Sequence, residues 1–112
     1  MPTGSISTSK GFIEVIIVTG TVLGTPATID ELTRLSLEHV RRSRSEPGCI
    51  SHAVHRHVEE PLRLVFVEQW TDKDALLAHF TVPASGEFVQ AAAALTAEPP
   101  GMEIFEATPT RV

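Results

Sequence analysis

Three stretches of the sequence decide its fold: Glu46-Pro47-Gly48-Cys49-Ile50-Ser51, Leu64-Val65-Phe66-Val67-Glu68-Gln69-Trp70 and Ala78-His79-Phe80. The first predicts the end of a helix followed directly by a strand, because Pro and Gly terminate helices. The second is rich in β-branched and aromatic residues and predicts a strand that pairs with the first. The third indicates a helix that carries one histidine beside an aromatic ring. Together they predict a small sheet covered by helices, with an apolar pocket that holds few polar groups.

The rest of the chain completes a βαββααβ order, which is typical of an α+β fold with an antiparallel sheet and helices on one face. Thr28 and Glu31 match a capping box, Thr71 is the expected N-cap of the second helix, and Pro83 interrupts the helical region. We expect strands over residues 12–19, 49–58, 62–70 and 102–107, a connection over 20–26, and helices over 28–45, 71–82 and 85–97. A single domain over 11–108 follows a leader over 1–10 and precedes a tail over 109–112.

The central hairpin has a predictable register. Its turn falls at Glu59-Glu60-Pro61, so residues whose numbers sum to about 120 lie opposite one another. The expected pairs on one face of the sheet are Ile50 with Trp70, His52 with Glu68, Val54 with Phe66, and Arg56 with Leu64. A slip of one residue gives His52 a different partner.

The second face of the predicted sheet is also apolar. Along each strand, the residues on this face alternate with those that face the helices. The apolar ones are Val15, Ile17, Val65 and Val67. The chain supplies no further element to cover them, and a second copy of the sheet is the simplest cover. We therefore expect a homodimer that packs sheet against sheet.

Composition narrows the function classes. The 112 residues are 42% hydrophobic and 21% charged, with a net charge of −5. This balance is typical of one globular domain and argues against a nucleic-acid partner or an anionic membrane surface. Cys49 is the single cysteine, so no intrachain disulfide forms. No run reaches transmembrane length and residues 1–10 lack the apolar core of a signal peptide, so we expect a cytoplasmic protein.

His79 is the strongest candidate for catalysis. It shares a helical face with Leu76 and Phe80, which points it at the sheet. An apolar cavity keeps an imidazole neutral, as a general base requires. The alternative is a structural histidine that hydrogen-bonds to a backbone carbonyl. Nearby aromatic residues make the two interpretations about equally strong.

His52 opposite Glu68 is the second candidate, because a carboxylate can orient an imidazole for catalysis. A stabilising cross-strand pair explains the same spacing, and Trp70 is explained by a core role as well as by a pocket wall. His39 faces the same cavity from the first helix. Arg56 is expected at the pocket mouth.

The sequence gives little indication of a metal site, a reactive cysteine, a nucleophile elbow or a phosphate-binding loop. His55 and His57 share a strand face but have no evident third ligand, so no metal ligand is assigned. Cys49 has no activating base and is interpreted as a small buried hydrophobe. The sequence also contains no nucleophile elbow and no phosphate-binding loop.

The sequence resembles the antibiotic-biosynthesis monooxygenase (ABM) domain, a family that includes quinol-monooxygenase-like proteins. The resemblance covers roughly residues 12–107. The matching residues are Arg44 to Cys49, Val54 to Arg56, Phe66 to Trp70, Asp72, Asp74 to Leu76, Ala78 to Phe80, Phe88-Val89 and Glu103 to Glu106. It implies a ferredoxin-like protomer, a dimeric α/β barrel and an apolar pocket between sheet and helices.

Family members include oxygenases that use O₂ without metal or flavin, haem-degrading enzymes and a signal-molecule isomerase. This chain contains no Asn and no Tyr, two residue types on which well-studied aromatic oxygenases of the family rely. The haem-degrading branch uses a Trp and a His at the positions held here by His79 and Val89, and it also uses an Asn. We therefore discount haem degradation.

The resulting expectation is a monooxygenase that oxidises a quinol or polyphenol with O₂ and needs no cofactor. His79 and His52 are the expected catalytic residues. The substrate-binding residues are expected to be Trp70, Phe66, Glu68, Phe80, Phe88, Arg56 and His39. Two alternatives remain open: a non-catalytic dimer that binds a small apolar ligand, and an isomerase or lyase of a small oxygenated metabolite.

Overall fold

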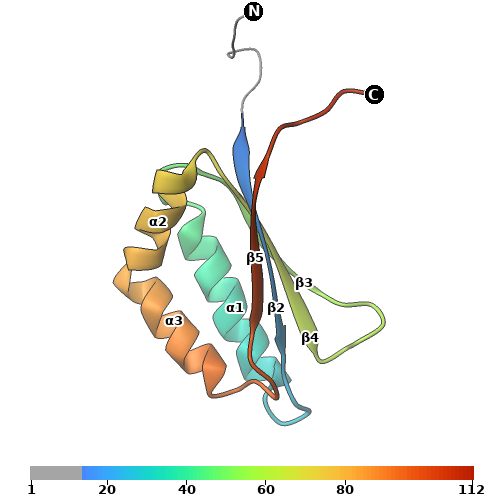
Figure 1. Cartoon of the computed structure of the whole chain (residues 1–112). Helices are drawn as coiled ribbons and strands as arrows, with labels where there is room; N and C mark the ends of the chain where they lie inside the picture. Colours follow the sequence, from blue (N-terminus) through green and yellow to red (C-terminus); the bar gives the residue numbers. More distant parts are fainter. Residues whose placement is uncertain (1–13) are drawn as a thin grey trace, which may run out of the picture.

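The computed structural model describes residues 14–112 (Figure 1). The predicted leader over residues 1–10 and the expected first strand residue, Phe12, lie outside the described residues. The elements are β2 (Val15–Leu23), α1 (Ile29–Ser43), β3 (Cys49–Arg56), β4 (Arg63–Trp70), α2 (Lys73–Thr81), α3 (Pro83–Ala93) and β5 (Gly101–Ala107). Their order confirms the predicted βαββααβ arrangement.

The four strands form one antiparallel sheet in the order β3-β4-β2-β5. All three helices lie on one face of this sheet, with α2 and α3 forming an arm beside α1 (Figure 1). This is the ferredoxin-like α+β fold that was expected. Within the described residues, no helix is both long and apolar enough to cross a membrane.

Strand β2 is longer than the sequence predicted. Gly20, expected in a connection, lies inside the strand, where it pairs with Phe66 of β4 and Met102 of β5. Hydrogen bonds from both neighbouring strands outweigh the weak strand preference of glycine. A Cβ at Gly20 would lie 3.4 Å from the carbonyl oxygen of Gly101. Because Gly20 has no side chain, space remains on the face of the sheet that is turned toward the helices.

The hairpin register was predicted correctly over most of its length. His52 pairs with Glu68 as expected, and so do the next two pairs toward the turn, Val54 with Phe66 and Arg56 with Leu64. The pairing of Ile50 was wrong, because the register shifts between Cys49 and Ser51 and places Cys49 opposite Trp70. This irregularity adds one residue to β3 and turns Ile50 toward solvent.

The helix starts differ from the predictions in three places. Thr28 occupies the N-cap position of α1, but its hydroxyl donates to the carbonyl oxygen of Leu95, 2.7 Å away, so no capping box forms. Asp72, rather than Thr71, caps α2, since its carboxylate accepts from the backbone N–H of Ala75. The helical region is interrupted at Pro83 as predicted, but α3 begins at Pro83 rather than at Ser85, because the first helical position needs no N–H donor.

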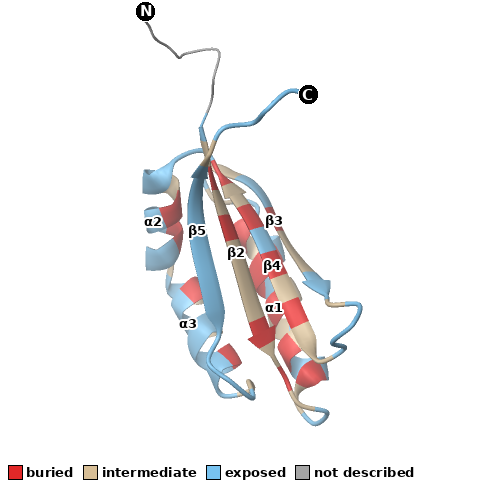
Figure 2. Cartoon of the chain, turned by 45° about the vertical axis from the view of Figure 1, so that its right-hand side comes forward, coloured by how far each residue is buried: buried red, intermediate tan, exposed pale blue. Residues whose placement is uncertain are grey.

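The core lies between α1 and the central strands β2 and β4. Its most buried members are Leu32, Val40, Val18, Leu64 and Trp70. Strand β5 is exposed along most of its length (Figure 2). Its inward side chains therefore form the open side of the space between the sheet and the α2–α3 arm.

The outer face of the sheet carries apolar side chains in the open. Val67 is 36% exposed and Phe105 is 47% exposed, and Phe105 pairs with Ile17 of β2. The expected two-sided apolar sheet is therefore present.

Candidate functional site

Three buried histidines from three different elements meet beneath the helices. His39 comes from α1, His52 from β3 and His79 from α2. Their ring centroids are 5.3, 5.4 and 5.5 Å apart, a nearly equilateral triangle. One ring nitrogen of each lies within 4.8 Å of the other two, which is close enough for the three to share a ligand.

His79 is held by a carboxylate. Its Nδ1 donates to Oε1 of Glu46 over 2.7 Å, and the side chain of His79 is 4% exposed. Glu46 lies in the turn between α1 and β3, just before Pro47 and Gly48. In the neutral ring, this bond places the proton on Nδ1 and leaves the lone pair on Nε2. A carboxylate in this position orients the imidazole.

His39 is held by a cation and a ring. The Arg42 guanidinium donates to Nδ1 of His39 over 3.0 Å and to the carbonyl oxygen of Ala84. The imidazole stacks on Phe88, with centroids 4.2 Å apart and planes inclined by 9°. Burial, assisted by the positive forms of His52, His79 and Arg42, lowers the pKa of His39 from 6.5 to about 3. His39 is therefore neutral at physiological pH.

His52 lies behind the other two rings, and its side chain is fully buried. Its Nε2 lies 3.3 Å from Oε1 of Glu68 without hydrogen-bond geometry, so neither ring nitrogen has a hydrogen-bond partner among residues 14–112. The same carboxylate oxygen accepts from the indole Nε1 of Trp70 over 2.9 Å. Burial raises the pKa of Glu68, but His52, Trp70 and His79 together outweigh burial and bring the pKa below its ordinary value. Glu68 is therefore ionised.

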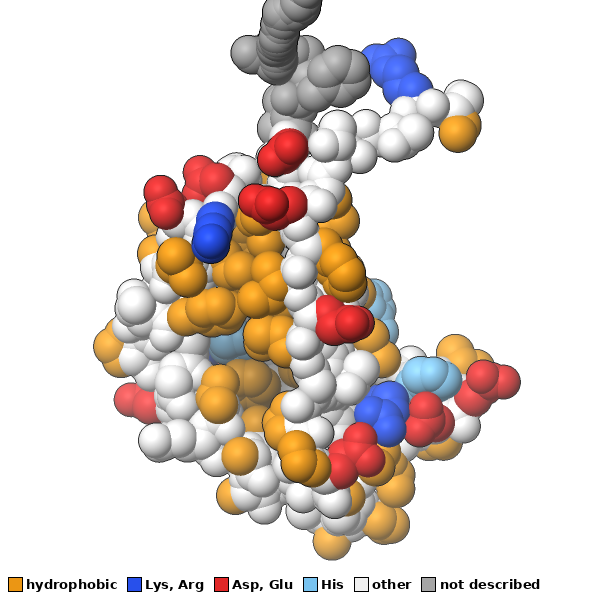
Figure 3. Space-filling model, in the orientation of Figure 1, with side chains coloured by type: hydrophobic (Ala, Val, Ile, Leu, Met, Phe, Trp, Pro, Cys, Tyr) orange, Lys and Arg blue, Asp and Glu red, His pale blue; other side chains and the backbone are white. Residues whose placement is uncertain are grey.

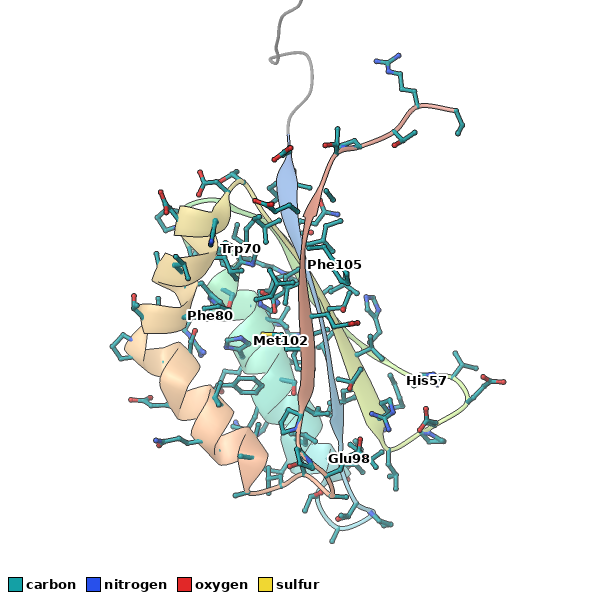
Figure 4. The ribbon with its side chains drawn as sticks, in the orientation of Figure 1. His57, Trp70, Phe80, Glu98, Met102 and Phe105 are labelled. Carbon is teal, nitrogen blue, oxygen red and sulfur yellow. The ribbon has the colours of Figure 1, made fainter. Side chains whose placement is uncertain are left out.

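An apolar cavity of about 210 Å³ opens beside the histidines. Figure 3 shows hydrophobic side chains gathered in this hollow between the α2–α3 arm and β5. Phe80 of α2 and Met102 of β5 lie at its opening (Figure 4). The cavity is lined by Gly20, Thr21, Val22, His39, Phe66, Glu68, His79, Phe80, Ser85, Gly86, Phe88, Val89, Ala92, Pro100, Gly101 and Met102. An engineered apolar cavity of about 150 Å³ holds benzene, so this one accommodates one substituted aromatic ring.

Most of the candidate residues named from the sequence meet at this cavity. Its wall contains His39, Phe66, Glu68, His79, Phe80 and Phe88. Two candidates, His52 and Trp70, lie behind the wall and contact it through Glu68 and His79.

The expected place of Arg56 was wrong. Its guanidinium donates to the carbonyl oxygen of Pro61 and to the hydroxyl of Thr33, and it is not among the residues that line the cavity. The part of β3 near the hairpin turn packs on α1 and not on the α2–α3 arm. An arginine in this part of the strand therefore cannot reach the opening of the cavity.

Two polar residues of the site, Glu46 and Arg42, were not predicted from the sequence. Glu46 was interpreted only as part of a helix stop, and Arg42 only as a cation at a helix end. Glu46 reaches His79 across 33 positions of sequence, a separation that no local motif reports. Arg42 was detectable, because it lies three positions after His39 and residues at this spacing are neighbours on a helix.

The arrangement suits proton transfer to or from a small apolar molecule. The imidazole of His79, oriented by Glu46, faces a space that is almost without polar groups, and the ionised Glu68 offers one acceptor for a hydroxyl. Apolar walls strengthen polar contacts to a bound molecule, because the local dielectric constant is low.

Comparisons with known proteins agree with this fold. The sequence profile of the family described as antibiotic biosynthesis monooxygenase matches residues 15–101. Protein sll1783 of Synechocystis sp. is 34% identical over 102 residues, which are 91% of this chain and 69% of that protein. A crystal structure of an antibiotic biosynthesis monooxygenase is similar with a TM-score of 0.78 and 26% identity, over 84% of this chain and 99% of the other. Protein SO0527 from Shewanella oneidensis is similar in fold, with a TM-score of 0.80 and 22% identity over 88% of this chain and 95% of the other. This chain belongs to the antibiotic biosynthesis monooxygenase family.

Proposed function

We propose that this protein is a monooxygenase that oxidises a small quinol or polyphenol with O₂ inside the apolar cavity. The observation that carries the proposal is the Glu46–His79 pair, which places an oriented imidazole in the wall of a cavity sized for one aromatic ring. Membership of the monooxygenase family supports the reaction class.

The first step is proton transfer from a phenolic hydroxyl to Nε2 of His79. A phenol has a reference pKa of about 10, well above that of imidazole, so the transfer is unfavourable in water. Glu46 offsets this difference, because its carboxylate stabilises the imidazolium that forms at His79. The proton transfer also leaves a negative phenolate next to a positive imidazolium. In the apolar cavity the Coulomb attraction between these two ions is strong.

The substrate itself supplies the electrons. The phenolate gives an electron to O₂, the resulting radicals join at a ring carbon, and the O–O bond then breaks. One oxygen atom stays on the ring, and the other leaves as water with two hydrogen atoms from the substrate. A quinol thus becomes a hydroxyquinone, with one O₂ consumed for each product formed.

The cavity wall holds the ring in place. Phe66 and Phe88 provide the inner apolar surface, with centroids 6.1 Å apart, and Phe80 covers the opening while remaining 44% exposed. Glu68 accepts a hydrogen bond from a second substrate hydroxyl. His52, behind Glu68, supports the position of that carboxylate and has no direct contact with the substrate.

The proposal is tested by oxygen uptake with a panel of quinols and polyphenols, after the protein has been freed of metal by a chelator. The wild type should consume O₂ faster than the spontaneous rate, and His79→Gln should lose roughly 10²–10⁴-fold of that activity. His57→Gln is the matched control, because His57 lies at the far end of the hairpin (Figure 4). No uptake with any compound would favour a non-catalytic binding module instead.

We also propose that the protein works as a homodimer through the outer sheet face. Val67 and Phe105 lie exposed on that face, and Ile17 lies between them in the sheet. Val67→Asp should shift the protein from dimer to monomer in light scattering. A wild type that is monomeric at micromolar concentration would contradict the dimer.

A further inference from the structure

A group of three buried imidazoles needs an explanation beyond a single base. The proposed function uses the lone pair of His79 and leaves His39 and His52 as supports. We infer that His39, His52 and His79 together form a binding site for one divalent transition-metal ion, with Zn²⁺ as the reference ion. The sequence predicted no metal ligand, because the pair considered there, His55 and His57, lacks a third ligand.

The geometry of the three rings suits one ion. Tetrahedral zinc with bonds of about 2.0–2.1 Å keeps its nitrogen ligands roughly 3.4 Å apart. The ring nitrogens here already lie within 4.8 Å of one another, so small side-chain rotations bring them to bonding distance. The ring centroids, 5.3–5.5 Å apart, are close to the roughly 5 Å that three imidazoles around one such ion require.

The state of the rings also suits metal binding. An imidazole binds a metal through the lone pair of one ring nitrogen, and the three rings here are buried side by side. His52 is fully buried, yet within the described part of the chain neither of its nitrogens has a hydrogen-bond partner. Buried polar atoms without partners are unfavourable, and a metal–nitrogen bond satisfies one of them.

Two carboxylates lie where metal sites typically place the hydrogen-bond partners of their histidine ligands. A ligating histidine usually donates its second ring N–H to a carboxylate or carbonyl. Glu46 accepts from Nδ1 of His79 at 2.7 Å, and Oε1 of Glu68 lies 3.3 Å from Nε2 of His52. The negative charges of both carboxylates also offset the positive charge that a bound cation brings to the site.

Arg42 opposes metal binding at His39. Its guanidinium only donates, so its 3.0 Å contact with Nδ1 of His39 places the ring proton on Nε2. Ligation through Nε2 requires that proton to leave or move to Nδ1. Arg42 then keeps its bond to the carbonyl oxygen of Ala84, 3.2 Å away. Its charge lowers the affinity without blocking the site.

The ion has a route to the site and an open position once bound. His39 and His79 line the cavity, and His52 lies behind the cavity-lining Glu68. Three histidines leave the fourth position of a tetrahedral ion facing the cavity, as in zinc sites that exchange a water or small ligand. Imidazole ligands favour zinc, copper, nickel and iron over magnesium and calcium.

This site goes beyond the proposed function and competes with it. Zinc takes the Nε2 lone pair that His79 needs as a base, so a zinc-loaded protein should lose oxygen uptake. Metal binding is measured without substrate, and oxygen uptake is measured after chelation. The failure of either inference is therefore visible independently of the other.

The test is a titration of the chelator-treated full chain with Zn²⁺ by calorimetry, with Co²⁺ absorption as a second readout. The wild type should bind one ion per chain, with tetrahedral Co²⁺ bands in the visible range. Bound zinc should also raise the melting temperature, because it connects two helices to the sheet. His52→Gln should weaken binding by more than about 100-fold, since even the loss of an outer partner weakens it roughly 10–100-fold.

Two further variants keep the result interpretable. His57→Gln, at the hairpin tip, should bind the ion like the wild type. If His52→Gln does not fold, His39→Gln provides the same test from the cavity wall. The inference is overturned if the wild type binds no stoichiometric ion, or if folded variants at His52 and His39 both keep wild-type affinity.

Discussion

The carboxylate of Glu46 lies 2.7 Å from Nδ1 of His79, a contact that joins the turn before β3 to the helix α2 across 33 positions of sequence. The contact fixes the tautomer of the histidine and directs its lone pair away from the carboxylate.

Replacing Glu46 by Gln should lower kcat by roughly tenfold or more, as part of the 10²–10⁴-fold that a positioned base contributes. The amide oxygen still accepts from His79, but it no longer stabilises the imidazolium. KM should change little, because Glu46 is not among the cavity-lining residues. Glu38→Gln, on the exposed face of α1, is the control. Equal losses in the two variants would exclude a specific role for Glu46.

Gly86→Leu should fill the cavity without straining the fold. Gly86 lies in α3 and lines the cavity, and a Cβ at this position would meet no atom of the described residues within 4 Å. The free energy of unfolding should rise by up to about 1 kcal/mol, because glycine is a poor helix former. KM for one-ring substrates should rise severalfold. Gly86→Ala separates the two effects, since it gains the helix stability with little loss of volume.

Gly48→Ala should destabilise the protein by roughly 1–3 kcal/mol. Gly48 has a φ of +81°, and its Cβ would lie 2.5 Å from Cβ of Ala75 and 2.8 Å from the hydroxyl of Thr71. Urea unfolding measures the loss. An unchanged midpoint would show that the turn does not need this conformation.

Stability should fall as the pH falls from about 6.5 toward 3. The unfolded chain protonates His39 near pH 6.5, whereas burial keeps the pKa of the folded His39 at about 3. The unfolded state therefore binds the extra proton in this window, and the slope from this group is at most about 1.4 kcal/mol per pH unit. Above pH 6.5 His39 contributes no slope.

Urea unfolding in the presence of a chelator, repeated at several pH values, measures this effect. His39→Gln should flatten the dependence between pH 6.5 and 4.5. The pKa of Glu68 is also lowered in the folded state, so its protonation reduces folding stability as well. This second loss of stability begins only as the pH drops below about 4.5. Identical slopes in the variant and the wild type would assign the dependence to other groups.

The sequence predicted the fold well because the fold depends on local patterns. The apolar run of β2, the Pro47-Gly48 stop and the alternation of β4 each determine one element, and the turn length determines the pairing of His52 with Glu68. The errors occurred where tertiary contacts override local preference. Gly20 is held in a strand by two neighbours, and the register shift after Cys49 has no composition signal.

The site was predictable in its residue types and less so in its connections. His79, His52 and the aromatic residues stand out because few polar groups fall on inward positions. The partner of His79 was not predictable, because Glu46 comes from a different part of the chain. The gathering of His39, His52 and His79 depends on how α1 and α2 pack on the sheet, and each histidine was therefore judged separately.

The most direct test of the account is a reaction of the chelator-treated protein with a quinol substrate under ¹⁸O₂, followed by mass spectrometry of the product. The wild type should place one labelled oxygen atom on the ring for each O₂ consumed, and His79→Gln should show only the spontaneous rate. A product without label, or equal labelling by the wild type and His79→Gln, would contradict a monooxygenase that depends on the Glu46–His79 pair.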